Sequence, residues 1–408
     1  MPFPLSTLVR ARRAAAASVA VLSILAAGST AAWAGPARPA GTESGTALVG
    51  VQFHGMWSMY TDSQRAYVLD KMQSAGVRSV RMDVAWSMLQ PYAATSYDAW
   101  GTGFVDRVIG MANARGIKPL ITLWLTPGWA NRNQGGRVLP DNPADYARVA
   151  RWAAYRWRGK VAGWEIWNEE NSPAFMAGAD PVAYTKLLRA AYPAVKTGDP
   201  YAPVVFGGLE YNDTAWITRA YDAGAKGYFD VMATHPYQGI ADLQPGTPDD
   251  GTKWTLTHAA AVHQLMVARG DGGKPIWFTE FGWSTHATAP DAPNWERGVT
   301  EATQALYLGQ TAALVRQQMP YVTALYWYND RDLTSGGIQL CNYGLFRRDL
   351  SAKPALAALA AANGRATATA TSSVRGVGGL GGGRVAVAAA SRPTSSHIRV
   401  SRTGLRNG

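Results

Sequence analysis

The chain has 408 residues and a formal net charge of +11, a combination that would suit a nucleic-acid-binding protein, but the positive charge lies at its two ends. Residues 1–43 carry +3 and residues 365–408 carry +7, which leaves +1 for residues 44–364. A nearly neutral body of this length argues against nucleic-acid binding and is long enough for one large core. The single cysteine, Cys341, excludes a disulfide bond within the chain.

The first 34 residues have the pattern of a secretory signal peptide. Three arginines precede the apolar run 14–27, and the sequence Ala-Trp-Ala ends at Ala34. This order of charged, apolar and small residues predicts export with cleavage after Ala34. A transmembrane anchor is the alternative, but the run is short and rich in alanine, so we expect no stable membrane insertion. Residues 35–46 then have the composition of a flexible linker.

The body, residues 47–364, alternates strand-like with helix-like segments. The strand-like segments are rich in β-branched and aromatic residues and lie at 48–54, 77–84, 117–125, 161–168, 203–207, 229–235, 275–281 and 322–328. The helix-like segments follow them at 62–75, 98–115, 142–158, 180–197, 214–223, 254–269, 296–318 and 354–363. Eight strand–helix pairs predict a single α/β domain with the closed (β/α)8 architecture, the TIM barrel. A doubly wound open sheet is the alternative, but no glycine-rich phosphate loop follows the first strand.

Two of the strand-like segments end in carboxylates. The apolar run 161–167 passes directly into Asn168, Glu169 and Glu170, and Glu280 lies at the end of 275–281. A carboxylate at the end of a buried strand is costly unless the strand delivers it to a site. In a barrel, the carboxyl ends of all strands meet at one mouth. Two strand-end glutamates are the minimum that glycosidic bond hydrolysis requires.

These strand ends resemble those of the retaining (β/α)8 glycoside hydrolases of clan A, particularly the family 5-like and family 39-like members. The resemblance covers residues 48–350, most of the body. In that clan an Asn–Glu pair ends the fourth strand and the glutamate is the general acid/base, which implies these roles for Asn168 and Glu169. The nucleophile ends the seventh strand, which implies that Glu280 is the nucleophile.

The same resemblance implies supporting roles for four further residues. An arginine near the end of the second strand orients the nucleophile and corresponds to Arg81. A His-x-Tyr motif after the sixth strand corresponds to His235 and Tyr237, and an aromatic floor on the eighth strand corresponds to Trp327. The expected partner is a poly- or oligosaccharide, and no cofactor and no metal are expected.

The chemistry of these residues agrees with the implied roles. A guanidinium beside Glu280 would favour its ionised form, and the resulting charge would raise the pKa of Glu169 and keep its proton available. Asn168 is suited to hydrogen-bond a sugar 2-hydroxyl, and Tyr237 is suited to donate a hydrogen bond to Glu280.

Each assignment has a competing interpretation. Glu170 is a second candidate for the acid, although strand alternation turns neighbouring side chains apart. Glu165 shares parity with Glu169 and is expected deeper in the barrel, beside an arginine and in a structural role. His54 ends the first strand, where contact with a sugar and a place in the core are equally compatible with the sequence. Trp124 and Trp283 also lie at strand ends, where an indole either stacks on sugar or packs in the core.

Residues 365–408 change in character to Ala/Thr alternation, a glycine-rich run and interspersed arginines, which predicts a disordered basic tail. The expected function is that of a secreted retaining β-glycosidase. A carbohydrate-binding pseudoenzyme and a transglycosylase with the same residues remain alternatives. A metal-dependent hydrolase would require a converging His/Asp cluster, whereas the six histidines are scattered along the chain.

Overall fold

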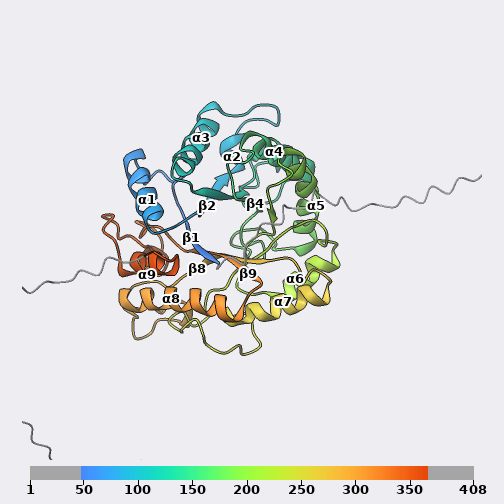
Figure 1. The fold of residues 1–408 in the computed structure, drawn as a ribbon. Coiled ribbons are helices and arrows are strands. Elements are labelled where there is room, and N and C mark those ends of the chain that lie inside the picture. Colours follow the sequence, from blue (N-terminus) through green and yellow to red (C-terminus); the bar gives the residue numbers. More distant parts are fainter. Residues whose placement is uncertain (1–46, 366–408) are drawn as a thin grey trace, which may run out of the picture. The chain divides into compact units, whose positions relative to one another are not determined.

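The computed structural model describes residues 47–365, and the predicted signal peptide, linker and residues 366–408 of the predicted tail lie outside this range. Nine strands are found within the described residues, all paired in parallel (Figure 1). They are β1 (Leu48–Gln52), β2 (Ser79–Ala85), β3 (Lys118–Trp124), β4 (Gly163–Ile166), β5 (Val204–Val205), β6 (Leu209–Glu210), β7 (Met232–His235), β8 (Ile276–Phe281) and β9 (Val322–Trp327).

The nine strands occupy eight positions of a closed barrel, because β5 and β6 are two halves of one interrupted strand. β5 pairs with β4, and β6 pairs with β7, at the two ends of the sheet order. Single bridges between Asn168 and Gly208 and between Val205 and Val231 join the same two neighbours across the interruption. The fold is therefore the predicted (β/α)8 barrel. The predicted fifth strand, 203–207, continues farther than the sequence indicated.

Helices surround the strands (Figure 1) and begin where the sequence offers capping groups. Thr61 and Gln64 form a capping box, and Asn142 caps a helix that has Pro143 in its first turn. The helices are α1 (Asp62–Ser74), α2 (Trp86–Leu89), α3 (Ala99–Asn113), α4 (Pro143–Arg156), α5 (Pro181–Gly198), α6 (Thr214–Asp222), α7 (Ala259–Ala268), α8 (Glu301–Gln318) and α9 (Pro354–Ala362).

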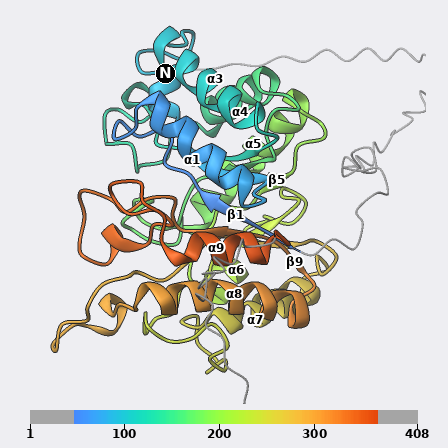
Figure 2. The same ribbon diagram turned by 60° about the vertical axis from the view of Figure 1, so that its left-hand side comes forward.

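Eight of these helices correspond to the predicted ones, and two of them start later than predicted. A short 3-10 turn, Leu256–His258, precedes α7, and the Thr300 side chain caps α8 by accepting from the Thr303 amide. α9 packs along α8 and against β1, so the last helix covers the seam between the first and last strands (Figure 2). No helix within residues 47–365 is long and apolar enough to cross a membrane.

The interior of the barrel has an apolar lower layer and a polar upper layer. Leu120, Val205, Val231, Ala233 and Tyr326 form a small buried cluster separate from the larger core between strands and helices. Above it, the inward-facing residues are polar, and they lie toward the carboxyl ends of the strands. The apolar layer closes the bottom of the barrel, and the polar layer forms the floor of its mouth.

Candidate active site

The backbone at the end of β4 turns two successive polar side chains into the mouth. Trp167 and Glu169 both have left-handed backbone torsions, with φ of 74° and 47°. Such torsions are strained for residues other than glycine, and they interrupt strand alternation. As a result, Asn168 contacts Arg81 and Glu169 contacts His235, both inside the barrel, whereas Trp167 packs in the outer core.

β8 reaches the same outcome by a different irregularity. The pairing of β8 with β9 shifts register between Phe278 and Phe281. Thr279 contacts His235 and Glu280 contacts Arg81, so two consecutive side chains face the interior. A register shift of this kind re-aims a side chain, and strict alternation would have placed Glu280 on the outer side with Phe278.

Arg81 lies at the centre of the polar layer and is fully buried. Its guanidinium donates to the carboxylates of Glu165 at 2.7 Å and Glu280 at 2.6 Å. It also donates to the side-chain oxygens of Gln52 at 2.9 Å and Asn168 at 2.6 Å. Burial opposes its charge, but the Glu165 and Glu280 carboxylates raise the pKa of Arg81 above its usual value. The arginine therefore stays charged and fixes both strand ends.

Glu280 and Glu169 are held by different partners. The Tyr237 hydroxyl donates to Oε2 of Glu280 at 2.9 Å, opposite the oxygen that Arg81 binds. Nδ1 of His235 lies 2.8 Å from Oε1 of Glu169, and Nε2 lies 3.1 Å from the Thr279 hydroxyl. Burial lowers the pKa of His235, so the imidazole is neutral. At Nδ1, a neutral ring can accept a hydrogen bond from a protonated carboxyl group. In its other tautomer, it can donate a hydrogen bond from Nδ1 to an ionised carboxylate.

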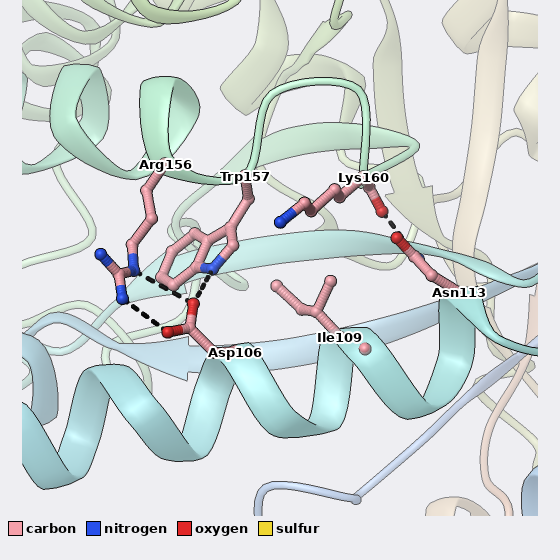
Figure 3. A pocket seen from close by; sticks show the side chains of 7 residues that line it. Asp106, Ile109, Asn113, Arg156, Trp157 and Lys160 are labelled. Carbon is pink, nitrogen blue, oxygen red and sulfur yellow. Dashed lines mark hydrogen bonds and ion pairs between the residues drawn. The ribbon is translucent and has the colours of Figure 1, made fainter.

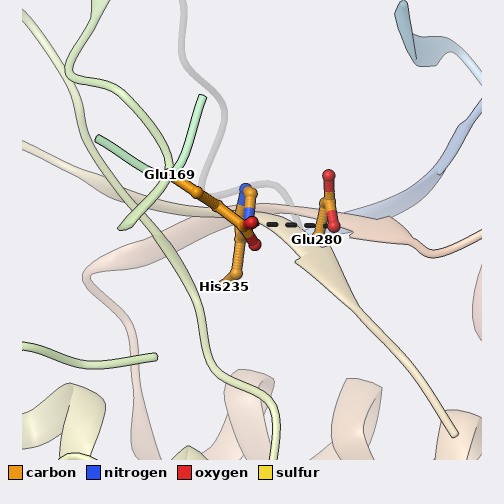
Figure 4. A group of neighbouring side chains, drawn as sticks. All are labelled: Glu169, His235 and Glu280. Atoms are coloured by element: carbon orange, nitrogen blue, oxygen red, sulfur yellow. Dashed lines mark hydrogen bonds and ion pairs between the residues drawn. The ribbon is translucent and has the colours of Figure 1, made fainter. Parts of the chain in front are cut away.

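Glu169, His235 and Glu280 converge on one point in the mouth (Figure 4). One ligand atom from each of the three lies within 4.8 Å of the other two, and all three residues are buried. The same geometry is compatible with two uses, a pair of catalytic carboxyl groups or three ligands of a divalent cation.

Burial sets the protonation of both glutamates. Burial and, after it, the neighbouring charge of Glu210 together raise the pKa of Glu169 to about 8, against the opposing effect of Arg81. Burial also raises the pKa of Glu280, although His235, Arg81 and the Tyr237 hydrogen bond act in the lowering direction. The expected effect of the arginine on Glu280 is therefore present, but desolvation is the larger effect.

Glu170 and Glu165 occupy separate surroundings from Glu169. A Cβ atom on Gly207 would lie 2.1 Å from Oε2 of Glu170, so this carboxyl packs against the backbone of the interrupted strand. Neither of its oxygens has a hydrogen-bond partner among the described residues, and burial raises its pKa well above the usual value. Glu165 lies in the polar layer, where Arg81 and the Thr122 hydroxyl both donate to Oε2.

Two tryptophans that were candidates for the mouth, Trp327 and Trp283, lie in the outer core. Trp327 is fully buried, its ring centroid is 5.3 Å from that of Phe281, and its indole donates to the Tyr343 carbonyl. Trp283 stacks on Trp327, and its indole donates to the Leu243 carbonyl. The assignment of Trp327 as the aromatic floor is corrected by strand alternation, because Tyr326 faces inward and its neighbour must face outward.

Tyr328 takes the place that was assigned to Trp327. Its ring lies near His54, Tyr237 and Tyr343, at centroid distances of 5.7, 6.4 and 5.4 Å. The alternation of β9, which turns residue 328 back to the inside, was a signal in the sequence that would have found it.

His54 lies at the mouth beside Tyr328, and it is also buried. Its backbone amide donates to Asp330 at 3.2 Å, and its ring lies tilted against that of Trp57, which is 40% exposed, with the ring centroids 4.1 Å apart. Trp124 is partly buried beside Trp167 and Phe175. The structure thus places His54 beside Tyr328 at the mouth. Trp124 instead lies beside Trp167 and Phe175, which follow β4.

A surface cavity of about 430 Å³ lies away from this cluster, between α3 and the segment that follows α4 (Figure 3). Its polar groups are mutually paired, because Arg156 and the Trp157 indole both donate to Asp106. The lining residues precede β3 and β4, so the cavity is at the amino ends of these strands. Barrel chemistry belongs to the opposite end.

Solved structures with the same fold include several glycoside hydrolases. A family 39 glycoside hydrolase from the gut symbiont Bacteroides cellulosilyticus WH2 is 23% identical with a TM-score of 0.62, covering 79% of this chain and 64% of its own. A GH5_18 protein from Streptomyces cattleya in complex with GlcNAc is 19% identical with a TM-score of 0.59, over 78% and 79%. The exo-beta-1,4-mannosidase Op5Man5 from Opitutaceae bacterium strain TAV5 is 18% identical with a TM-score of 0.57, over 78% and 59%.

At these identities the structural similarity shows the fold alone, and the chain spans less than two thirds of the length of the family 39 protein. The sequence similarity goes further. Residues 40–329, more than half of the chain, match the family model described as Cellulase (glycosyl hydrolase family 5), and the match includes Arg81, Glu169 and Glu280. The chain therefore belongs to the cellulase family, glycosyl hydrolase family 5.

Proposed function

We propose that the protein is a secreted, retaining β-glycosidase that hydrolyses a poly- or oligosaccharide by double displacement. The observation that carries this proposal is the convergence of Glu169 and Glu280, which have an oxygen each within 4.8 Å of the other. Retaining enzymes place their two carboxyl groups about 5–5.5 Å apart, whereas inverting enzymes need about 6.5–9.5 Å to admit a water molecule. The close approach favours the retaining class.

In the first step, Glu280 attacks the anomeric carbon while Glu169 protonates the leaving oxygen. The hydrogen bonds from Arg81 and Tyr237 aim the Glu280 carboxylate and offset part of the cost of burying its charge. The pKa of about 8 keeps Glu169 protonated at neutral pH. The bond from Glu280 to the sugar forms as the bond to the leaving oxygen breaks, and the proton of Glu169 leaves with the alcohol.

In the second step, the ionised Glu169 removes a proton from water, which attacks the anomeric carbon and releases Glu280. His235 suits both states of Glu169, because Nδ1 can accept from the acid or donate to the carboxylate. The Thr279 hydroxyl can accept from Nε2 in the first case and donate to it in the second. Every tautomer of the imidazole therefore keeps two hydrogen bonds through the cycle.

Asn168 is placed to bind the sugar at its 2-hydroxyl. Arg81 donates to the side-chain oxygen of Asn168, which fixes the orientation of the amide and leaves its NH2 group as a donor. A hydrogen bond at the 2-hydroxyl that strengthens in the transition state contributes several kcal/mol in enzymes of this type.

A divalent cation bound by Glu169, His235 and Glu280 is the second candidate that the same geometry suggests. The guanidinium of Arg81, 2.6 Å from Glu280, would repel such a cation, and it favours the metal-independent mechanism. Hydrolysis that persists after exhaustive treatment with EDTA supports the double displacement. Loss of hydrolysis with EDTA and its recovery with added metal would select the second candidate.

Hydrolysis of a panel of β-linked polysaccharides and 4-nitrophenyl β-glycosides, with product analysis, tests the activity itself. The panel should include β-mannosides and β-xylosides, because solved structures with this fold are described as an exo-beta-1,4-mannosidase and a beta-xylosidase. Release of sugar by the wild-type protein supports hydrolysis, and transfer to an added sugar acceptor would indicate a transglycosylase. Binding without any turnover would indicate the carbohydrate-binding pseudoenzyme.

Secretion has its own test. The signal-peptide pattern of residues 1–34 supports export, and mass spectrometry of protein recovered from the culture medium should show Gly35 as the new N-terminus. A cell-associated protein that retains its apolar run at 14–27 would contradict the proposed export.

A further inference from the structure

β6 brings a third carboxylate, that of Glu210, to the side of the mouth where Glu169 lies. β6 pairs with β7 so that Glu210 lies opposite His235, and the Glu169 amide donates to the Gly208 carbonyl at 2.9 Å. The residue two positions before Glu210 faces the interior, because a Cβ on Gly208 would lie 2.1 Å from Nε2 of His235. Strand alternation therefore turns Glu210 into the mouth as well, one layer above Gly208.

The Glu210 carboxylate has no hydrogen bond or ion pair within residues 47–365, although its side chain is half-buried. Its backbone is fixed on both sides by the Asn171 amide, which accepts from the Glu210 N–H and donates to its carbonyl. The strand thus holds a free acceptor group in a defined place at the mouth. The mechanism described above does not use this group.

A pair of aromatic rings begins at Tyr211, the residue that follows Glu210. The Tyr211 ring lies against the Trp254 ring, edge to face, with centroids 4.5 Å apart. Trp254 keeps 45% of its surface exposed. Tyr211 thus links the strand end that carries the Glu210 carboxylate to an exposed indole. The two groups suit a sugar, because its hydroxyl groups can donate to the carboxylate while its C–H face packs on the ring.

We propose that Glu210 and Trp254 form the binding site for the leaving-group sugar of an oligosaccharide. The Glu210 carboxylate accepts hydrogen bonds from hydroxyl groups of that sugar, and the Trp254 indole packs against its apolar face. The proposal rests on the double displacement by Glu169 and Glu280. The acid protonates the oxygen of the leaving group, so the sugar that departs must lie on the Glu169 side of the mouth.

The electrostatics of the site agree with this location. Among the charged neighbours, Glu210 has the largest effect in raising the pKa of Glu169, after the effect of burial. It is not among the principal influences on the pKa of Glu280, which come from burial, His235, Arg81, Glu169 and Tyr237. Glu210 therefore belongs to the acid side of the mouth and not to the nucleophile side.

The experiment compares two substrates with the same sugar at the cleavage point. One is the β-glycosyl fluoride, whose one-atom leaving group cannot reach Glu210, and the other is the β-1,4-linked trisaccharide. The sugar is whichever of glucose, mannose or xylose the wild-type enzyme hydrolyses fastest. Steady-state kcat/KM is measured for Glu210→Ala, Glu210→Gln and Trp254→Ala at a pH well below the basic limb of the wild-type profile.

Glu210→Ala should lower kcat/KM on the trisaccharide by roughly 10- to 100-fold, because a charged acceptor of sugar hydroxyl groups is lost. Trp254→Ala should lower it by roughly 3- to 10-fold. Glu210→Gln keeps one acceptor oxygen and should fall between Glu210→Ala and wild type. All three should hydrolyse the glycosyl fluoride within about twofold of wild type, since its leaving group makes neither contact.

Asp291→Asn is the matched control, because it removes an exposed carboxylate from the loop between β8 and α8 and should change neither substrate. Equal losses on both substrates would show that Glu210 acts on the site as a whole, and unchanged activity on both would show a solvated carboxylate. Either result overturns the leaving-group site. If the wild-type enzyme cleaves neither the fluoride nor any oligosaccharide, the proposed hydrolysis itself fails.

Discussion

Glu169 and Glu280 face each other across the mouth of the barrel, yet their two sides differ in what they offer a carboxyl group. Glu280 receives a hydrogen bond on each oxygen, one from the Arg81 guanidinium and one from the Tyr237 hydroxyl. Glu169 contacts a neutral imidazole and lies near a second carboxylate, Glu210. Burial raises the pKa of both groups, but only Glu280 has two donors that offset the cost of its charge, and the proposed mechanism therefore gives the two identical side chains opposite roles.

The two sides also differ in how the backbone delivers the carboxyl group. Glu280 faces the mouth because of a register shift within β8, whereas Glu169 does so through its own left-handed torsion after β4 has ended. Backbone strain at a functional site persists only where neighbouring contacts determine the conformation. Here the Glu169 amide bonds to Gly208 and the Trp167 amide bonds to Leu123, so the neighbouring strands hold the turn.

Removing the charged side of the pair should have the largest effect. Glu280→Ala leaves no nucleophile, and kcat should fall by more than about 10⁴-fold on every substrate. Added azide should restore turnover and give a glycosyl azide of inverted configuration, because it attacks from the vacated side. A variant that keeps a hundredth or more of wild-type activity without azide would exclude Glu280 as the nucleophile.

Removing the proton-bearing side should have a smaller effect that depends on the substrate. Glu169→Ala should lower kcat/KM by about 10²- to 10⁴-fold on substrates that need a proton on the leaving oxygen. Aryl glycosides with strongly acidic phenols need none, so their kcat/KM should change little and a glycosyl-enzyme intermediate should accumulate. Uniform loss across a series of phenols would contradict the role of Glu169 as the acid.

The pH dependence tests both sides at once. Glu169 must be protonated in the first step, so kcat/KM should fall as the pH rises through about 8, the pKa to which burial raises this group. Glu280 must be ionised, so kcat/KM should also fall as the pH drops through its pKa, which burial raises above 4.5. Glu210→Gln removes a like charge and should move the basic limb to lower pH. A basic limb that stays at the same pH in this variant would show that the charge of Glu210 does not affect the pKa of Glu169.

The smallest effect is expected at Glu170, the immediate neighbour of the acid. Burial raises the pKa of Glu170 well above its usual value, which favours the neutral carboxyl group. Glu170→Gln preserves shape and neutrality, and kcat/KM should stay within about threefold of wild type. Glu169→Gln, measured under the same conditions, shows how much activity is lost when the acid itself is replaced by an amide. If Glu170→Gln is the one that loses activity in a leaving-group-dependent manner, the acid has been assigned to the wrong residue.

The sequence predicted the barrel and most of its helices because the periodicity of the hydrophobic residues and the capping groups are local signals. It also singled out the strand ends at which Glu169 and Glu280 converge, since a carboxylate at the end of an apolar strand is conspicuous. It did not reveal the break between β5 and β6, because that break depends on pairing with β4 and β7 at different heights. Glu210 was missed for the same reason.

The aromatic residues were the weakest part of the sequence interpretation. Trp327 was assigned to the mouth by resemblance, but it faces the outer core and its neighbour Tyr328 faces the opposite side of β9. Strand alternation alone would not have predicted which side chains face the mouth, because it is broken at Glu169 and at Glu280. A torsion or a register shift at a strand end is set by tertiary contacts, and the identity of the residues does not encode it locally.

The stereochemistry of the first-formed product tests the central claim most directly, because it depends on the distance between Glu169 and Glu280 and on which of them attacks. Proton NMR of the anomeric signals during the first minutes of hydrolysis, before mutarotation, distinguishes the two outcomes. Direct attack by Glu280 followed by water predicts that the product first appears in the β configuration of the substrate. An α product that appears first would show a single displacement by water and would contradict the assignment of Glu280 as nucleophile.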